Sequence, residues 1–183
     1  MNDPHVESLT YRMEAKPGVV SFENPPPLVH ETEAFRLRLE GGVLTVEMKG
    51  HYPTAREART SVEGYLRDWT LFSALDFDSI PMDFIFENAR LIDRNPLPQV
   101  PGHVTGEAHL VMGPFTIQAY ATVTPPARKE YPKPPSGFRA SPDVETMWLR
   151  YRQHVEGKEP LASMAYACLT IMQGSTGLSQ GAR

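Results

Sequence analysis

The chain has 183 residues, of which 40% are hydrophobic and 22% charged, which is typical of a soluble globular protein with one well-buried domain. A formal net charge of −4 argues against wholesale binding to nucleic acid, although a local basic patch is compatible with it. The single cysteine excludes an intrachain disulfide, the N-terminus has no apolar core of signal-peptide length, and no apolar run reaches the length of a membrane span. We therefore expect a cytoplasmic protein without a membrane partner.

The first thirty residues have weak patterns. Gly18–Phe22 fits a short strand, and the three prolines at 25–27 end it because proline cannot donate a hydrogen bond within a sheet. Leu28–Glu33 is interpreted as an acidic loop that enters the next strand.

Residues 34–49 predict a β-hairpin. Apolar and polar side chains alternate on both sides of Gly41–Gly42, and two glycines between alternating runs are a hairpin signal. With a two-residue turn, opposed positions are Leu39 with Leu44, Leu37 with Val46, Phe35 with Met48 and, on the other face, Arg36 with Glu47. The apolar set pairs with itself, so the hairpin has one buried face.

Pro53–Leu75 predicts a helix that lies across this sheet, because apolar residues recur at three and four positions. Pro81–Asp93 predicts a strand, and a change of alternation near Asn88 indicates a β-bulge there. A loop then covers 94–102.

A second hairpin is predicted over 103–124, around Gly113–Pro114. Val104 to Met112 and Phe115 to Val123 alternate in the same way, so that one face is apolar and the other polar. The whole of 1–124 is therefore predicted to form one antiparallel sheet with a packed helix.

The rest of the chain divides into three parts. Residues 125–142 form a proline-rich, basic and extended linker, 143–173 form a helical hairpin, and 174–183 form a flexible tail. Ser141 is the expected N-cap and Gly157 the expected end of the first helix. The second helix, Leu161–Gln173, is apolar on all sides, which predicts burial among several neighbours. The fold class is thus α+β, and the helices need the sheet, another copy of the chain or further residues as a partner.

Two segments resemble helices of uncharacterised bacterial proteins that have a β-rich N-terminal part and a HEPN-like helical C-terminal part. These segments are Val62–Leu75 and Trp148–Thr170. The resemblance implies that the C-terminal helices begin a helical bundle. It also implies an RNA-cleaving pair, Arg150 and His154, although three residues separate them here and four to six separate the pair in the nucleases of that family.

Metal and acid–base candidates lie elsewhere. His103, Glu107 and His109 share one strand face, but only Glu107 and His109, about 7 Å apart, are near enough to bind one metal. They would need further ligands from another strand, such as His30, Glu31 or His51. The other groups are three aspartates, Asp76, Asp78 and Asp83, and a helical cysteine, Cys168, which is interpreted as a small core residue.

No nucleophile elbow, phosphate-binding loop or dinucleotide fingerprint is present in the sequence. We therefore expect a non-catalytic binding or protein-interaction module with no cofactor, which forms a homo-oligomer or binds a protein partner through 143–173. Trp148, Tyr151 and Met147 are the predicted contact residues. The alternatives are an RNA-cleaving enzyme that uses Arg150 and His154 and a metal-dependent enzyme that uses Glu107 and His109; nucleic acid is the less favoured partner.

Overall fold

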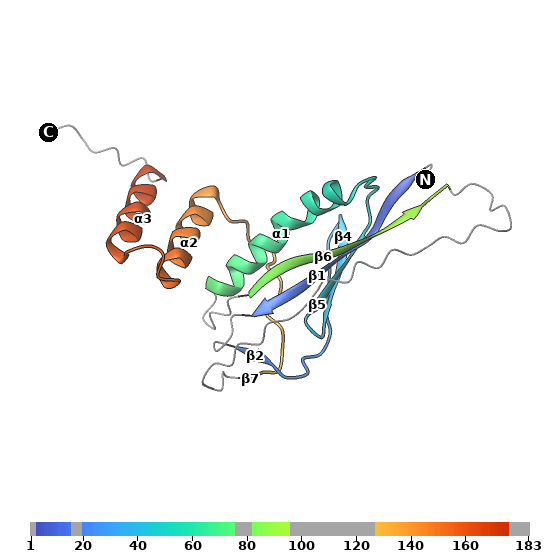
Figure 1. Cartoon of the computed structure of the whole chain (residues 1–183), viewed down its shortest axis with the longest axis horizontal. Helices are drawn as coiled ribbons and strands as arrows, with labels where there is room; N and C mark the ends of the chain where they lie inside the picture. The colour runs from blue at the N-terminus through green and yellow to red at the C-terminus, as the bar shows by residue number, and fades with distance from the viewer. Residues whose placement is uncertain (1–2, 16–19, 76–81, 96–126, 176–183) are drawn as a thin grey trace.

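A computed structural model describes residues 3–15, 20–75, 82–95 and 127–175, and it confirms the α+β fold class. Figure 1 shows one helix lying along an antiparallel sheet and a helical pair beyond the end of that helix. The strands are β1 (Pro4–Ala15), β2 (Ser21–Phe22), β3 (Leu28–Glu31), β4 (Phe35–Glu40), β5 (Val43–Met48), β6 (Met82–Asp93) and β7 (Ala127–Arg128). The helices are α1 (Ala55–Leu75), α2 (Pro142–Val155) and α3 (Leu161–Ser175). In the described part of the chain, no helix combines the length and the apolarity that crossing a membrane requires.

The β4–β5 hairpin has the predicted register. Leu37 lies opposite Val46, Phe35 opposite Met48, and Arg36 opposite Glu47 on the other face. Both turn residues, Gly41 and Gly42, have positive φ (57° and 79°), a backbone conformation that glycine adopts without steric cost.

The main sheet has the order β3-β4-β5-β1-β6, and β1 lies between β5 and β6 as a twelve-residue strand. The sequence did not reveal this strand, because polar residues interrupt its apolar alternation. The interpretation of Leu28–Glu33 as a loop is wrong for Leu28–Glu31, which form the edge strand β3. An edge strand of this kind needs pairing on one side only, so its sequence can remain polar.

β6 carries the predicted bulge. Thr10 pairs with Asn88 and the next residue, Tyr11, pairs with Phe86, so Glu87 is the extra residue on β6. A second irregularity lies on β1, between Val6 and Ser8.

The core lies between α1 and one face of the sheet. Trp69 of α1 is fully buried, and its ring contacts Phe84 of β6 at a centroid distance of 4.9 Å. The other fully buried side chains of largest volume come from all the central elements: Tyr11, Leu9, Leu37, Leu39, Leu44, Leu71, Met82, Val6, Val46 and Val62.

The start of the predicted linker packs on this core. Tyr131 is buried, and its hydroxyl oxygen accepts a hydrogen bond from the Gly42 amide at 3.0 Å. The Trp69 indole donates to the Pro132 carbonyl at 3.2 Å, and the Ala140 amide donates to the Asp68 carboxylate at 2.9 Å. The proline-rich segment therefore packs along α1 between Pro132 and Ala140, and it leads into α2.

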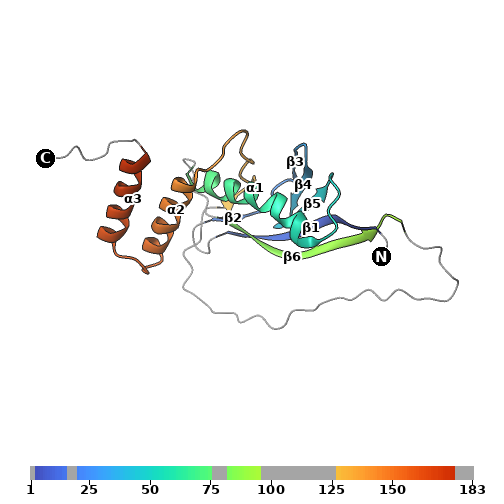
Figure 2. The same ribbon diagram turned by 90° about the horizontal axis from the view of Figure 1, so that it is seen from above.

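The helical hairpin extends from one end of the sheet domain, with α2 nearer to α1 and α3 on the far side (Figure 2). Neither α2 nor α3 contains a buried residue. The prediction that Leu161–Gln173 is buried among several neighbours is therefore not met within the described residues, where α3 packs against α2.

Candidate functional site

The hairpin begins and turns as the sequence predicts. Ser141 caps α2 by accepting a hydrogen bond from the Val144 amide at 3.3 Å, and Pro142 occupies the first turn. Gly157 follows α2 with a φ of 73°, and its amide donates to the His154 carbonyl. The chain can therefore reverse direction and enter α3 within five residues.

Arg150 and His154 both contact Glu159 in this turn. The Arg150 guanidinium donates to Glu159 Oε1 at 2.8 Å, and His154 Nδ1 lies 3.0 Å from the Glu159 carbonyl oxygen. The Glu159 side chain is only 7% exposed, and the Ser163 hydroxyl donates a second hydrogen bond to Glu159 Oε1 at 3.0 Å. The two residues predicted as an RNA-cleaving pair thus lie on one face of α2, where they hold the α2–α3 turn.

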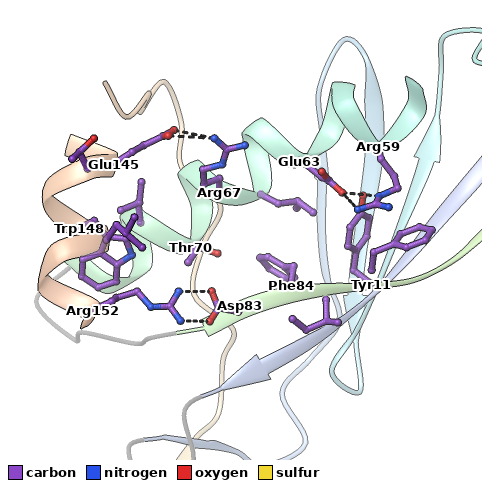
Figure 3. A pocket seen from close by; sticks show the side chains of 16 residues that line it. Tyr11, Arg59, Glu63, Arg67, Thr70, Asp83, Phe84, Glu145, Trp148 and Arg152 are labelled. Carbon is purple, nitrogen blue, oxygen red and sulfur yellow. Dashed lines mark hydrogen bonds and ion pairs between the residues drawn. The ribbon is translucent and has the colours of Figure 1, made fainter. Parts of the chain in front are cut away.

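Two ion pairs join α2 to the sheet domain, as Figure 3 shows. Arg152 donates two hydrogen bonds of 3.0 Å to Asp83 of β6, one to each carboxylate oxygen. Arg67 of α1 contacts Glu145 at 3.2 Å. All four side chains are more than one-third exposed, so each pair contributes at most about 1 kcal/mol.

A cleft of 630 Å³ lies between these two ion pairs, with Trp148 and Leu149 of α2 on one wall (Figure 3). α1 and β6 supply the opposite wall, including Leu66 and Phe84. The charged residues that line the cleft are three arginines and three carboxylates, and each arginine contacts a carboxylate: Arg59 with Glu63, Arg67 with Glu145, and Arg152 with Asp83. The cleft therefore has no net formal charge, and the uncharged part of its lining is mostly apolar.

Tyr11 lies at the inner end of this cleft. Burial, together with the carboxylate of Glu63, raises the pKa of Tyr11 to about 12. Its hydroxyl is therefore protonated at neutral pH.

Both helices of the hairpin expose apolar side chains. The large apolar side chains that are at least two-fifths exposed are Leu149, Tyr151 and Val155 on α2 and Leu161, Tyr166, Leu169 and Met172 on α3. Trp148 and Tyr151, two of the predicted contact residues, lie next to each other with ring centroids 5.5 Å apart. The third, Met147, is half-buried on the same helix.

The predicted metal residues Glu107 and His109, and His103 with them, lie outside the described residues. Their suggested partners have other contacts: His30 stacks on Tyr65, Glu31 pairs with Lys49 at 2.7 Å, and His51 pairs with Asp3 at 3.0 Å. Among the described residues, no group of three or more potential ligands is positioned to hold a metal ion.

The structure describes two of the four remaining candidate residues, Asp83 and Cys168. Asp83 binds Arg152, whereas Asp76 and Asp78 lie outside the described residues. Cys168 is half-buried and contacts Met164 within α3, at 3.8 Å between the sulfur atoms. No catalytic carboxylate pair or activated thiol emerges from these contacts in the described part of the chain.

Sequence reasoning missed the cleft and its ion pairs. Arg152 and Asp83 lie sixty-nine positions apart, and such a separation leaves no local pattern. The role of Glu159 had a weak signal, since an acidic residue between Gly157 and Pro160 occupies a tight helix–helix turn. No protein-family model, curated protein or solved structure matches this chain.

Proposed function

We propose that the chain is a non-catalytic protein-interaction module that assembles through α2 and α3. The observation that carries this proposal is the contrast between composition and burial in the hairpin. Its two helices expose seven large apolar side chains and bury no residue. Burial of one such side chain contributes about 1.5–3 kcal/mol to the free energy of association. A partner that covers several of them would therefore be bound favourably.

The sheet domain serves as the scaffold in this proposal. Its core is closed by α1, and the segment before α2 is tied to that core through Tyr131 and Ala140. The hairpin is thereby presented at one end of the domain (Figure 2). Trp148 and Tyr151 are the expected anchors, since aromatic residues dominate the energetics of most protein interfaces.

A photo-crosslinking amino acid at position 151 tests this proposal in cells that express the full chain. We expect a covalent protein adduct from that position, and we expect the additional change Trp148→Ala to reduce it. The matched control places the same amino acid at Val29, which is 50% exposed on the edge strand β3. Equal adducts from both positions, or none from position 151, would contradict the proposal.

The HEPN-like nuclease is the alternative function, with Arg150 and His154 as its residues. An RNA-degradation assay separates it from the interaction module. We expect no degradation by the purified chain and no difference after His154→Ala. Degradation that His154→Ala abolishes would replace the interaction module by the nuclease.

A further inference from the structure

A second cavity, of about 600 Å³, lies between the C-terminal part of α1 and the proline-rich segment that follows β7. We name it the basic pocket, and its charged lining residues are Arg128, Lys129, Glu130 and Lys133. It shares no lining residue with the cleft beside Trp148, and none of its lining residues belongs to α2 or α3. Its volume lies within the usual range of small-molecule sites.

The backbone that carries these charges is held at both ends of the pocket. The Glu23 amide donates a hydrogen bond to the Arg128 carbonyl at 3.0 Å, and the Trp69 indole donates one to the Pro132 carbonyl at 3.2 Å. The prolines of the segment restrict its backbone further. The pocket is therefore largely formed before a ligand arrives, which reduces the entropy lost on binding.

The basic pocket concentrates positive charge in an acidic chain. Three cations and one carboxylate give its lining a formal charge of +2, whereas the whole chain carries −4. Lys129 and Lys133 are exposed, and neither forms an ion pair with any residue that the structure describes. The other two described lysines, Lys49 and Lys158, both bind a carboxylate. The positive charge of the pocket is therefore available to an anion.

We infer that the basic pocket binds the phosphate monoester of a small organic molecule. A phosphate monoester carries a charge of about −1.5 to −2 at pH 7, which matches the lining, whereas a single carboxylate would leave one positive charge unmatched. Lysine side chains bind phosphate oxygens as point charges. Nucleic acid fits less well, because its long backbone would also meet the acidic remainder of the chain. This inference goes beyond the proposed function and does not depend on it.

The uncharged part of the lining suits an organic group that contains a ring. Phe72, Pro132 and Pro134 line the same cavity as the lysines. Phe72 is half-buried, and its ring packs against that of Phe138 at a centroid distance of 5.5 Å, which fixes its position. A planar ring gains free energy by stacking on an aromatic side chain, whereas inorganic phosphate does not. We therefore expect a phosphate monoester with a ring to bind more tightly than phosphate itself.

Titrations of the full chain followed by amide NMR shifts test the inference with three probes. Adenosine monophosphate has both a ring system and a phosphate monoester, adenosine has only the ring system, and inorganic phosphate has only the charge. We expect adenosine monophosphate to bind with a dissociation constant of about 1 mM or lower, and at least about tenfold more tightly than either of the others. The shift changes should centre on residues 128–136 and on Phe72 and Ser73.

Two pairs of substitutions locate the binding site. Lys129→Gln with Lys133→Gln should weaken the binding of adenosine monophosphate at least about tenfold, without changing the free energy of unfolding, because both lysines are exposed and unpaired. Lys49→Gln with Lys158→Gln is the matched control, since it removes the same charge from exposed lysines outside the pocket and should leave binding unchanged. Phe72→Leu should weaken the binding of adenosine monophosphate but not that of inorganic phosphate.

Three results would overturn the inference. The first is the absence of shift changes in the pocket with all three probes at about 10 mM. The second is an equal loss of binding in the control pair, which would show that only net charge matters. The third is binding of a twelve-residue oligouridylate at least about tenfold more tightly than adenosine monophosphate through the same lysines, which would replace the small molecule by nucleic acid. None of these results bears on the adducts expected from position 151.

Discussion

α1 and α3 show how differently two helices of one chain can use their apolar residues. α1 carries several charged residues, yet it buries seven positions, and Trp69 and Leu66 are among those in the hydrophobic core. α3 carries no charge, yet it buries none. Burial stabilises apolar side chains, but the side chains of a helix are buried only where another element packs against them. The difference teaches that α1 belongs to a packed core, whereas the apolar residues of α3 remain partly or fully exposed among the described residues.

The largest expected effect separates the two regions by stability. Trp69→Ala should lower the free energy of unfolding by about 3–5 kcal/mol, because it leaves a cavity in the core and removes the hydrogen bond to Pro132. Leu169→Ala, on the exposed side of α3, should change it by less than about 0.5 kcal/mol at concentrations where the chain is monomeric. Urea unfolding measures both changes. Equal losses of unfolding free energy would contradict the conclusion that Trp69 is part of a packed core and Leu169 is not.

The second effect concerns the hairpin turn. Arg150→Ala should destabilise the α2–α3 pair by about 1–3 kcal/mol, because it removes the ion pair of the buried Glu159 carboxylate. Hydrogen exchange of α3 amides would report this loss even if the sheet domain remains folded. Arg38→Ala, which breaks an exposed ion pair with Glu40 on β4, is the control and should leave α3 exchange unchanged.

The third effect concerns the attachment of the hairpin to the sheet. Asp83→Asn should weaken that attachment by at most about 1 kcal/mol, since the bidentate contact with Arg152 is exposed to solvent. Proteolytic cleavage between the domain and α2 should become faster, and raising the salt concentration should have a similar effect on the wild type. An attachment insensitive to both changes would indicate that packing across the cleft holds α2 instead.

The smallest effect is a pH dependence confined to the sheet domain. Burial, followed by the charge of Arg94, lowers the pKa of His5 below 6.5; His51 acts in the same direction, and Asp3 and Glu7 oppose it. The Arg94 guanidinium lies 2.9 Å from His5 Nε2, and the Tyr52 amide donates to Nδ1 at 3.4 Å. At a pH between the lowered pKa and 6.5, the unfolded chain binds more protons than the folded chain. The stability that neutral His5 provides is therefore complete above about pH 6.5 and declines as the pH falls below it.

Urea midpoints between about pH 7.5 and pH 5 measure this pH dependence. His5→Gln should flatten the decline relative to the wild type. The same decline in both proteins would show that other groups cause it.

Local patterns predicted much of the sheet domain. Alternation fixed the β4–β5 register because one buried face tolerates no slip, and helical spacing placed α1 within two residues of its observed start. β1 was missed, although it is central, because neighbours on both sides can bury a strand whose own sequence is mixed. Long-range pairing of this kind leaves no trace in a single short window.

The candidate site was predictable only in part. The caps of α2 and the apolar character of α3 are local properties, and both could be read directly. The nuclease alternative depended on a family resemblance of Arg150 and His154. Their observed contacts depend instead on the position of Glu159 after the turn, which gives both residues a structural role. Glu107 and His109 remain a prediction, outside the described residues.

Hydrogen exchange of the purified chain tests the central claim most directly, namely that α1 is packed in a core and α3 is not. We predict lower protection factors for the α3 amides than for the α1 amides, because α3 buries no residue and therefore opens at a lower cost in free energy. An α3 that is protected as strongly as α1 would contradict this difference between the two helices.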